Sequence, residues 1–228
     1  MANKDVIIFG TGQLASLAHF YLKYDSPYNV AAFTVDKSYK QSDVFEEKPV
    51  IAFEEVEKHY SPLLFSMFLP VSFKRMSHLR REKFETAKAK GYKCISYVSS
   101  KATTWPDLQV GENCFIFEDN TIQPFVKIGN NCVLWSGNHI GHHTEIKDHV
   151  FITSQVVISG CCTIEEHSFL GVNSTVRDET IIGKETLIGM GAVITKDTLP
   201  ESIWFAAKSI LQSGKSSDLE SISHKTGG

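Results

Sequence analysis

The amino-acid sequence predicts two units of different architecture, a Rossmann-like α/β domain over residues 1–100 and a left-handed parallel β-helix over residues 101–208. Two observations carry this prediction. Short apolar strands alternate with helical segments in the first hundred residues, which is typical of an α/β sheet. From Val110 onward an aliphatic residue recurs at every sixth position, a period that belongs to neither a simple strand nor a helix.

The first unit is expected to contain five strands and two helices. A buried-type strand over residues 5–10 leads into a helix that ends near Lys23, because apolar residues there recur at the spacing of one helix face. These residues are Leu14, Leu17, Ala18, Tyr21 and Leu22. The other strands are expected at residues 30–35, 48–53, 64–71 and 92–98, and a charged helix at 73–90.

The loop between the first strand and the first helix follows the pattern G-x-G-x-x-A, with Gly10, Gly12 and Gln13 at its start. Glycines permit a tight turn here, and the N-terminus of the helix offers free N–H groups to a phosphate. Asp36 ends the second strand, where its carboxylate could accept hydrogen bonds from a ribose or a base. We therefore take these four residues as candidate nucleotide-binding residues, although a plain strand-to-helix turn explains the same loop. The segment has too few strands for a full dinucleotide fold, which favours a mononucleotide half-site over NAD.

The second unit is defined by fifteen aliphatic residues in unbroken six-residue register. They are Val110, Ile116, Ile122, Ile128, Leu134, Ile140, Ile146, Ile152, Ile158, Ile164, Leu170, Val176, Ile182, Ile188 and Ile194. This hexapeptide pattern is typical of the left-handed parallel β-helix, in which three hexads form one triangular coil, so five coils are expected. Residues eighteen apart should therefore stack on neighbouring coils at roughly the 4.8 Å spacing of paired strands.

The eighteen-residue rule gives two further expectations. Cys114 and Cys132 should stack inside the prism as small apolar side chains rather than as a disulfide. His149 and His167 should form a ladder along one edge, at the surface or in a trimer interface. The segment 209–228 is rich in Ser and Lys and breaks the repeat, so it is expected to be mostly mobile, with at most a short helix at 218–223.

Composition excludes several classes of protein. The 228 residues include 23 basic and 26 acidic side chains, and this balance gives no electrostatic reason to expect nucleic acid or an anionic membrane as partner. No apolar run is long enough to span a bilayer, and the first residues lack the features of a signal peptide. Five cysteines without CxxC spacing form neither a disulfide scaffold nor a zinc site. A cytoplasmic protein is expected.

An α/β domain followed by this β-helix resembles the PglD/NeuD-type sugar acyltransferases, whose members use acetyl-CoA to acetylate a nucleotide-linked amino sugar or a sialic acid. Their catalytic segment I-x-H-[DE]-x-x-I matches residues 140–146, which read Ile-Gly-His-His-Thr-Glu-Ile. The resemblance implies that His142 is the catalytic base. His143 stands where relatives carry an acid that orients the base. Asn138, Glu145 or a carboxylate of a neighbouring subunit would have to take over that task.

The chemistry of acyl transfer accounts for a histidine at this place. Attack on a thioester needs a base near neutrality and a donor for the oxygen on which negative charge develops. Gly160 lies eighteen residues after His142, so its backbone should sit one coil above the imidazole with no side chain between them. The resemblance implies that its N–H holds the thioester carbonyl. The candidate catalytic residues are therefore His142, Gly160 and His143, with a surface or subunit contact as the other interpretation of His143.

The resemblance also implies that acetyl-CoA is the co-substrate and lies in the groove between two subunits of a homotrimer. Its pantetheine arm would pass Gly160, Gly189 and Gly191, and Lys196 or Lys208 could meet its phosphates. The residues of the first unit would hold a nucleotide-linked sugar.

No metal is expected at the three histidines of residues 138–143. The adjacent His142 and His143 are expected to point in different directions, and neither a carboxylate nor a cysteine falls at a recognisable ligand spacing. Of the two cysteines that follow Gly160, Cys162 should point inward and be inert, whereas the position of Cys161 is open.

The function that the sequence favours is acetyl-CoA-dependent N-acetylation of a 4-amino-4,6-dideoxy sugar on a uridine or thymidine diphosphate carrier, by direct attack with His142 as base. The choice of sugar rests on the resemblance alone. O-acetylation of a sialic acid is the alternative within the family. A non-catalytic trimeric β-helix with a nucleotide-sensing domain, and an NAD(P)-linked enzyme that uses the glycine loop, are the alternatives from other classes.

Overall fold

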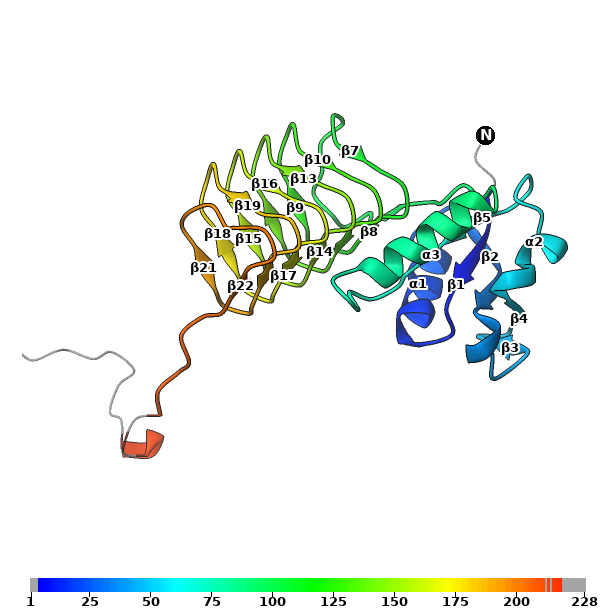
Figure 1. Ribbon diagram of the computed structural model, residues 1–228, viewed down its shortest axis with the longest axis horizontal. Coiled ribbons are helices and arrows are strands. Elements are labelled where there is room, and N and C mark those ends of the chain that lie inside the picture. The colour runs from blue at the N-terminus through cyan, green and yellow to red at the C-terminus, as the bar shows by residue number, and fades with distance from the viewer. Residues whose placement is uncertain (1–3, 212, 214, 219–228) are drawn as a thin grey trace, which may run out of the picture.

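The computed structural model describes residues 4–211, 213 and 215–218, and it places an α/β domain beside one end of an elongated β-helix (Figure 1). Among these residues, no helix has both the length and the apolar character that crossing a membrane requires. The C-terminal segment contains one short 3-10 helix, η3 (Ser216–Asp218). The short helix expected at 218–223 lies almost entirely outside the described residues.

The α/β domain is built on a five-stranded sheet of order β3-β4-β2-β1-β5, parallel except for the β3–β4 hairpin. Its elements are β1 (Asp5–Phe9), α1 (Gln13–Tyr24), β2 (Asn29–Val35), η1 (Lys37–Tyr39), β3 (Val44–Phe45), β4 (Lys48–Ala52), η2 (Phe53–Glu55), α2 (Val56–His59), β5 (Ser66–Phe68) and α3 (His78–Ala89). The buried strands β1 and β2 read as continuous apolar runs because both faces of the sheet are covered.

Two elements differ from the sequence prediction. The helix expected from residue 73 begins only at His78, because Arg75, Met76 and Ser77 all have positive φ and form a turn instead. The last expected strand does not close the α/β sheet. Cys94 makes a single bridge to that sheet, and β6 (Tyr97–Val98) pairs with the first coil of the β-helix.

The β-helix has three parallel sheets, which form the three faces of a prism. The β8 face contains β6, β8 (Phe115–Ile116), β11 (Val133–Leu134), β14 (Phe151–Ile152), β17 (Phe169–Leu170), β20 (Leu187–Ile188) and β22 (Ile203–Trp204). The β9 face contains β9 (Thr121–Ile122), β12 (His139–Ile140), β15 (Val157–Ile158), β18 (Thr175–Val176) and β21 (Val193–Ile194). The β10 face contains β7 (Gln109–Val110), β10 (Lys127–Ile128), β13 (Glu145–Ile146), β16 (Thr163–Ile164) and β19 (Ile181–Ile182).

The predicted fold class and its five coils are confirmed. Each of the fifteen periodic aliphatics is the second residue of one strand, and strands eighteen residues apart pair in register, as Ile140 does with Ile158. These side chains form one continuous apolar column, to which Cys114 and Cys132 also belong. All five cysteines are free, and Cys162 points inward as expected.

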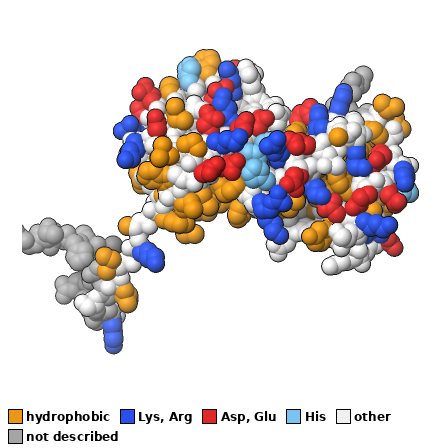
Figure 2. Space-filling view, in the orientation of Figure 1, with side chains coloured by type: hydrophobic (Ala, Val, Ile, Leu, Met, Phe, Trp, Pro, Cys, Tyr) orange, Lys and Arg blue, Asp and Glu red, His pale blue; other side chains and the backbone are white. Residues whose placement is uncertain are grey.

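The β8 face carries the contact with the α/β domain. Its outward side chains Phe115, Val133 and Phe151 are buried, and they pack in one cluster with Ala18 and Leu22 of α1. Because residues of both units share this cluster, burial of apolar surface attaches the domain to one face of the prism. Figure 2 shows the other end of the β-helix without such a cover, with hydrophobic side chains exposed over the last coils.

A polar ladder lines the prism edge between the β10 and β8 faces, and we call Asn113, Asn131, His149 and His167 the domain-contact ladder. Asn113 donates to Asn131 over 2.8 Å, and the amide of Asn131 lies 2.9 Å from Nδ1 of His149. The rings of His149 and His167 stack with centroids 4.7 Å apart. The eighteen-residue ladder is thus confirmed.

The expected surface location of this ladder is wrong. His149 is 8% exposed and His167 is 1% exposed, because α3 and the turn before it lie over them. His78 of α3 stacks on His167 with centroids 4.3 Å apart, and Nδ1 of His167 lies 3.0 Å from the carbonyl oxygen of Met76. The two histidines therefore belong to the contact between the domains.

This burial predicts a pH-dependent stability. The pKa of His149 is lowered from 6.5 to about 4, and burial is the largest cause. His167 and Arg80 contribute to this lowering, whereas Asp148 raises the pKa. Between these pH values the unfolded chain takes up a proton at His149 that the folded chain does not, so the free energy of unfolding falls as the pH falls. The loss over this window is roughly 3 kcal/mol at most.

Chemical unfolding at pH 7 and at pH 5 measures this loss. The matched control is His149→Asn, which places at this rung the residue type that Asn113 and Asn131 already provide. We expect the variant to lose less stability on acidification than the wild type. Equal losses in the two proteins would show that His149 is not the titrating group.

Candidate active site

The three histidines of residues 138–143 lie around the prism edge where the β9 face turns into the β10 face, and we call this the His142 edge. His139 belongs to β12 and is half-buried on the outer side of its face. His142 and His143 occupy the turn that follows, and both are exposed. The turn one coil further on contains Gly160 and Cys161.

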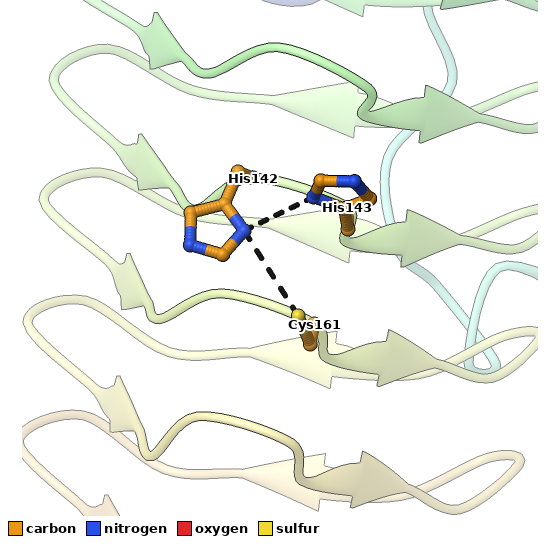
Figure 3. A group of neighbouring side chains, drawn as sticks. All are labelled: His142, His143 and Cys161. Carbon is orange, nitrogen blue, oxygen red and sulfur yellow. Dashed lines mark hydrogen bonds between the residues drawn. The ribbon is translucent and has the colours of Figure 1, made fainter.

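The side chains of His142, His143 and Cys161 converge (Figure 3). Nδ1 of His142 lies 3.1 Å from Nδ1 of His143 and 3.9 Å from Sγ of Cys161. The expectation that the two adjacent histidines diverge is therefore wrong. His143 has φ of 57°, a left-handed conformation that changes the direction of its side chain relative to an extended residue.

Two residues of the preceding coil, neither of them predicted from the sequence as a site residue, hold this turn. The side-chain oxygen of Gln123 accepts a hydrogen bond from the backbone N–H of His142 over 2.8 Å. The ring of Phe125, 60% exposed, lies against the ring of His143 with centroids 4.6 Å apart. Phe125 is eighteen residues before His143, so the eighteen-residue spacing predicts that the two residues stack on neighbouring coils.

Gly160 lies directly beside the imidazole, as the spacing predicts. A Cβ atom at Gly160 would lie 2.8 Å from Cε1 and 2.9 Å from Nε2 of His142, so any side chain here would displace the ring. Among the described residues, none accepts a hydrogen bond from the Gly160 N–H, whereas the N–H of Cys161 donates to the carbonyl of His142 over 2.8 Å. A free donor therefore sits next to a potential base.

The residues considered as replacements for the missing acid do not contact the imidazole. Asn138 is buried, with its amide donating to Asn120 and to the carbonyl of Trp135. Glu145 pairs with Lys147 over 2.7 Å. Among the described residues of one chain, Nδ1 of His142 faces the ring of His143 at 3.1 Å and, further away, Sγ of Cys161 at 3.9 Å.

The glycine loop of the first unit borders a shallow pocket of about 340 Å³, lined in part by Gly10, Gly12, Gln13 and Pro70. Gly10 has φ of 107°, which suits glycine, and its N–H donates to the carbonyl of Thr34 over 2.7 Å.

Asp36 does not line this pocket. Its carboxylate is held by the ammonium group of Lys83 on α3 over 2.6 Å. The four candidate nucleotide-binding residues are therefore only partly brought together.

The residues expected to bind the coenzyme are not brought together, because they lie on different edges of the prism. Gly189 and Gly191 follow β20, so they lie on the edge between the β8 and β9 faces and not on the His142 edge with Gly160. A Cβ at Gly189 would lie 2.3 Å from the ring of Phe205, so this glycine admits the returning chain. Lys208 follows β22 and is exposed. One groove along a single edge cannot contain this whole set.

The α/β domain and the His142 edge lie on opposite sides of the prism. The domain covers the β8 face, and the His142 edge joins the other two faces, so it is the corner opposite that face. The glycine-loop pocket and His142 therefore belong to different sides of one chain.

Two families match the β-helix in sequence. Residues 107–141 match the bacterial transferase hexapeptide (six repeats), and residues 162–196 match the hexapeptide repeat of succinyl-transferase. Both matches lie within the β-helix and agree with its six-residue period. No curated protein matches the chain in sequence.

Solved structures share the fold over nearly the whole chain. The acetyltransferase domain of PglB from Neisseria gonorrhoeae FA1090, in complex with acetyl coenzyme A, superposes with a TM-score of 0.79 at 21% identity, over 90% of this chain and 97% of that one. PerB from Caulobacter crescentus, in complex with CoA and GDP-perosamine, gives 0.79 at 20% identity, over 90% and 95%. WeeI from Acinetobacter baumannii AYE gives 0.68 at 17% identity, over 87% and 94%. The fold that the resemblance implies, an α/β domain followed by a β-helix of hexapeptide repeats, is thereby confirmed.

Proposed function

We propose that this protein is an acetyl-CoA-dependent N-acetyltransferase of a nucleotide-linked amino sugar. The observation that carries the proposal is the His142 edge, where an exposed imidazole lies beside Gly160, whose N–H has no acceptor among the described residues. His142 would take the proton of the sugar amine as its nitrogen attacks the thioester carbonyl. The Gly160 N–H would donate to the carbonyl oxygen as negative charge develops on it.

His143 acts in this proposal as the positioning residue that replaces the family's acid. When Nδ1–H of His142 donates to the unprotonated Nδ1 of His143, Nε2 of His142 is left without a proton and can act as the base. The contact of Phe125 with the ring of His143 supports that orientation. A neutral imidazole would thus set the tautomer of His142, a task that needs an acceptor and not a charge.

The separation of the two binding regions within one chain supports a homotrimer. A nucleotide held at the glycine loop, with Gly10, Gly12 and Gln13 around it, cannot present its sugar to the His142 of the same chain across the prism. In a trimer, the loop of one subunit would serve the His142 edge of its neighbour. The coenzyme would then contact Gly160 of one subunit and the residues around Gly189 and Lys208 of another. We place this reaction in the cytoplasm, where acetyl-CoA and nucleotide sugars are available.

Release of free CoA tests the proposal directly. The purified protein would be incubated with acetyl-CoA and a panel of 4-amino-4,6-dideoxy sugars on UDP, dTDP and GDP carriers, and separately with a sialic acid. The GDP carrier is included because PerB was solved with GDP-perosamine. We expect one carrier to give turnover and an N-acetylated product by mass spectrometry. Turnover only with a sialic acid would favour O-acetylation, and binding of a nucleotide without any CoA release would favour a non-catalytic role.

Substitution of His143 separates a positioning role from a structural one. We expect His143→Ala to lower kcat about ten- to a hundredfold, less than loss of the base itself would, with little change in KM. His143→Asp restores the acid of the family and should recover most of the activity. Because a carboxylate favours the protonated imidazole, the acidic limb of its pH–activity profile should move to higher pH. If His143→Ala and His143→Asp lost activity equally, the positioning role would be wrong.

A further inference from the structure

The two imidazoles and one thiol that converge at the His142 edge form a cluster of possible metal ligands. Nδ1 of His142, a ring nitrogen of His143 and Sγ of Cys161 all lie within 4.8 Å of one another, and all three side chains are exposed. We propose that these residues form an inhibitory binding site for a zinc-class divalent ion. The ion is a regulator here, because the transfer reaction itself requires no metal.

The two distances from Nδ1 of His142 are near those of a zinc site, and all three ligand atoms lie within 4.8 Å. With Zn–N bonds of 2.0–2.1 Å and a Zn–S bond of 2.3 Å, two nitrogens of a tetrahedral site lie about 3.3 Å apart, and nitrogen and sulfur about 3.6 Å apart. The corresponding distances here are 3.1 Å between the two histidines and 3.9 Å between His142 and Cys161. Small rotations of exposed side chains bring all three atoms to an ion, and the fourth position stays open for water.

The backbone presents these ligands as a fixed set. His143 and Cys161 occupy equivalent positions of stacked turns, eighteen residues apart, and both have left-handed backbone with φ of 57° and 59°. The N–H of Cys161 donates to the carbonyl of His142 over 2.8 Å, which ties the two turns together. Imidazole and thiolate are the ligands that zinc prefers, and an oxygen-preferring ion such as Mg²⁺ finds none here.

Proton balance explains why a bound ion would inhibit, a consequence that rests on the proposed function. Binding releases the thiol proton of Cys161 to solvent, and each neutral imidazole keeps its single proton. When the ion occupies the lone pair on Nδ1 of His142, that proton resides on Nε2. The base can then no longer accept a proton from the sugar amine. Affinity for the ion should rise with pH, because a proton is lost on binding.

Cobalt titration of the full chain, stripped of metal with a chelator, tests the site without any assay of activity. We expect Co²⁺ to give the visible bands of a tetrahedral complex and a near-ultraviolet thiolate-to-cobalt band. Cys161→Ser should abolish the thiolate band, and His143→Ala should weaken binding roughly tenfold or more. The matched controls are Cys162→Ser, whose thiol points into the core, and His139→Ala, whose side chain lies on β12. Both should bind as the wild type does. An unchanged band in Cys161→Ser would overturn the proposal.

The effect on transfer is measured separately. Micromolar Zn²⁺ should inhibit CoA release by the wild type, a chelator should restore it, and Cys161→Ser should need roughly tenfold more Zn²⁺ for the same inhibition. Equal inhibition of wild type and Cys161→Ser, or activation by Zn²⁺, would refute the inhibitory role. If the wild type showed no transfer with any acceptor, the proposed function would fail, while the cobalt titration would still decide whether the ion binds.

Discussion

Replacing His142 with alanine is expected to lower kcat/KM for acetyl transfer by about 10²–10⁴-fold, the range that a general base contributes. The affinity for acetyl-CoA should change little, because the imidazole acts on the acceptor's proton and not on the coenzyme. Steady-state CoA release with the best acceptor of the panel measures the first quantity, and calorimetric titration with CoA measures the second. His139→Ala is the matched control, since His139 lies three residues away on the outer side of β12.

A double substitution makes this prediction sharper. If His143 acts only by orienting His142, then its removal should cost nothing further once the base is gone. The variant with both histidines replaced should therefore be as active as His142→Ala alone. Activity of His142→Ala close to that of the wild type would refute the assignment of the base. A double variant far below His142→Ala would mean that His143 contacts the substrate itself.

The fold could be predicted from the sequence because the repeat length along the chain determines which residues stack on neighbouring coils. Each coil closes after eighteen residues, so the register of Ile140 on Ile158, and the place of Gly160 beside His142, follow from counting. The sequence also indicates which face of the prism the α/β domain covers. The residue before each aliphatic is apolar on the β8 face, as in Phe115 and Phe151, whereas the equivalent residues of the other faces include Thr121, His139, Lys127 and Glu145.

The eighteen-residue spacing does not predict in which direction the side chains of the turns point. Whether His142 and His143 converge depends on the left-handed backbone of His143, which the hexad pattern does not state. Asn131 and Asn173 occupy equivalent turn positions with φ of 56° and 57°, and asparagine is a residue type that tolerates this conformation. The edge on which a coenzyme-binding glycine lies also depends on its place within the coil. Gly160 and Gly189 lie on different edges of the prism, and Gly189 makes room for Phe205.

The second large effect is expected at Arg80, which joins the two domains. Its guanidinium group is completely buried beneath α3, and it donates to the carbonyls of His149 over 2.9 Å and Val150 over 3.2 Å. Burial lowers its pKa to about 10, so the group remains charged at neutral pH. Among the described residues, none accepts a hydrogen bond from its Nε or Nη1. The ring of Phe151 lies 5.5 Å from the guanidinium carbon.

Arg80→Ala removes the charge-assisted hydrogen bonds to the carbonyls of His149 and Val150 and to the hydroxyl of Ser77. The Val150 carbonyl still accepts from the N–H of Val133, but the buried His149 carbonyl loses the only donor it has among the described residues, and a cavity opens in the domain contact. The cost of burying the charge disappears as well and offsets part of this loss. We expect the free energy of unfolding to fall by about 2–4 kcal/mol. Arg80→Met keeps most of the buried stem, so its free energy of unfolding should lie between those of the alanine variant and the wild type.

Arg81→Ala is the matched control, because Arg81 is the next residue of the same helix but forms only an exposed pair with Glu85 over 2.6 Å. Such a pair contributes less than about 0.5 kcal/mol, so chemical unfolding should barely distinguish this variant from the wild type. Equal stability of Arg80→Ala and Arg81→Ala would show that the buried guanidinium does not hold the domains together. Arg80→Met at wild-type stability would instead assign the effect to packing of the buried stem, because the carbonyl of His149 would then tolerate the loss of its donor.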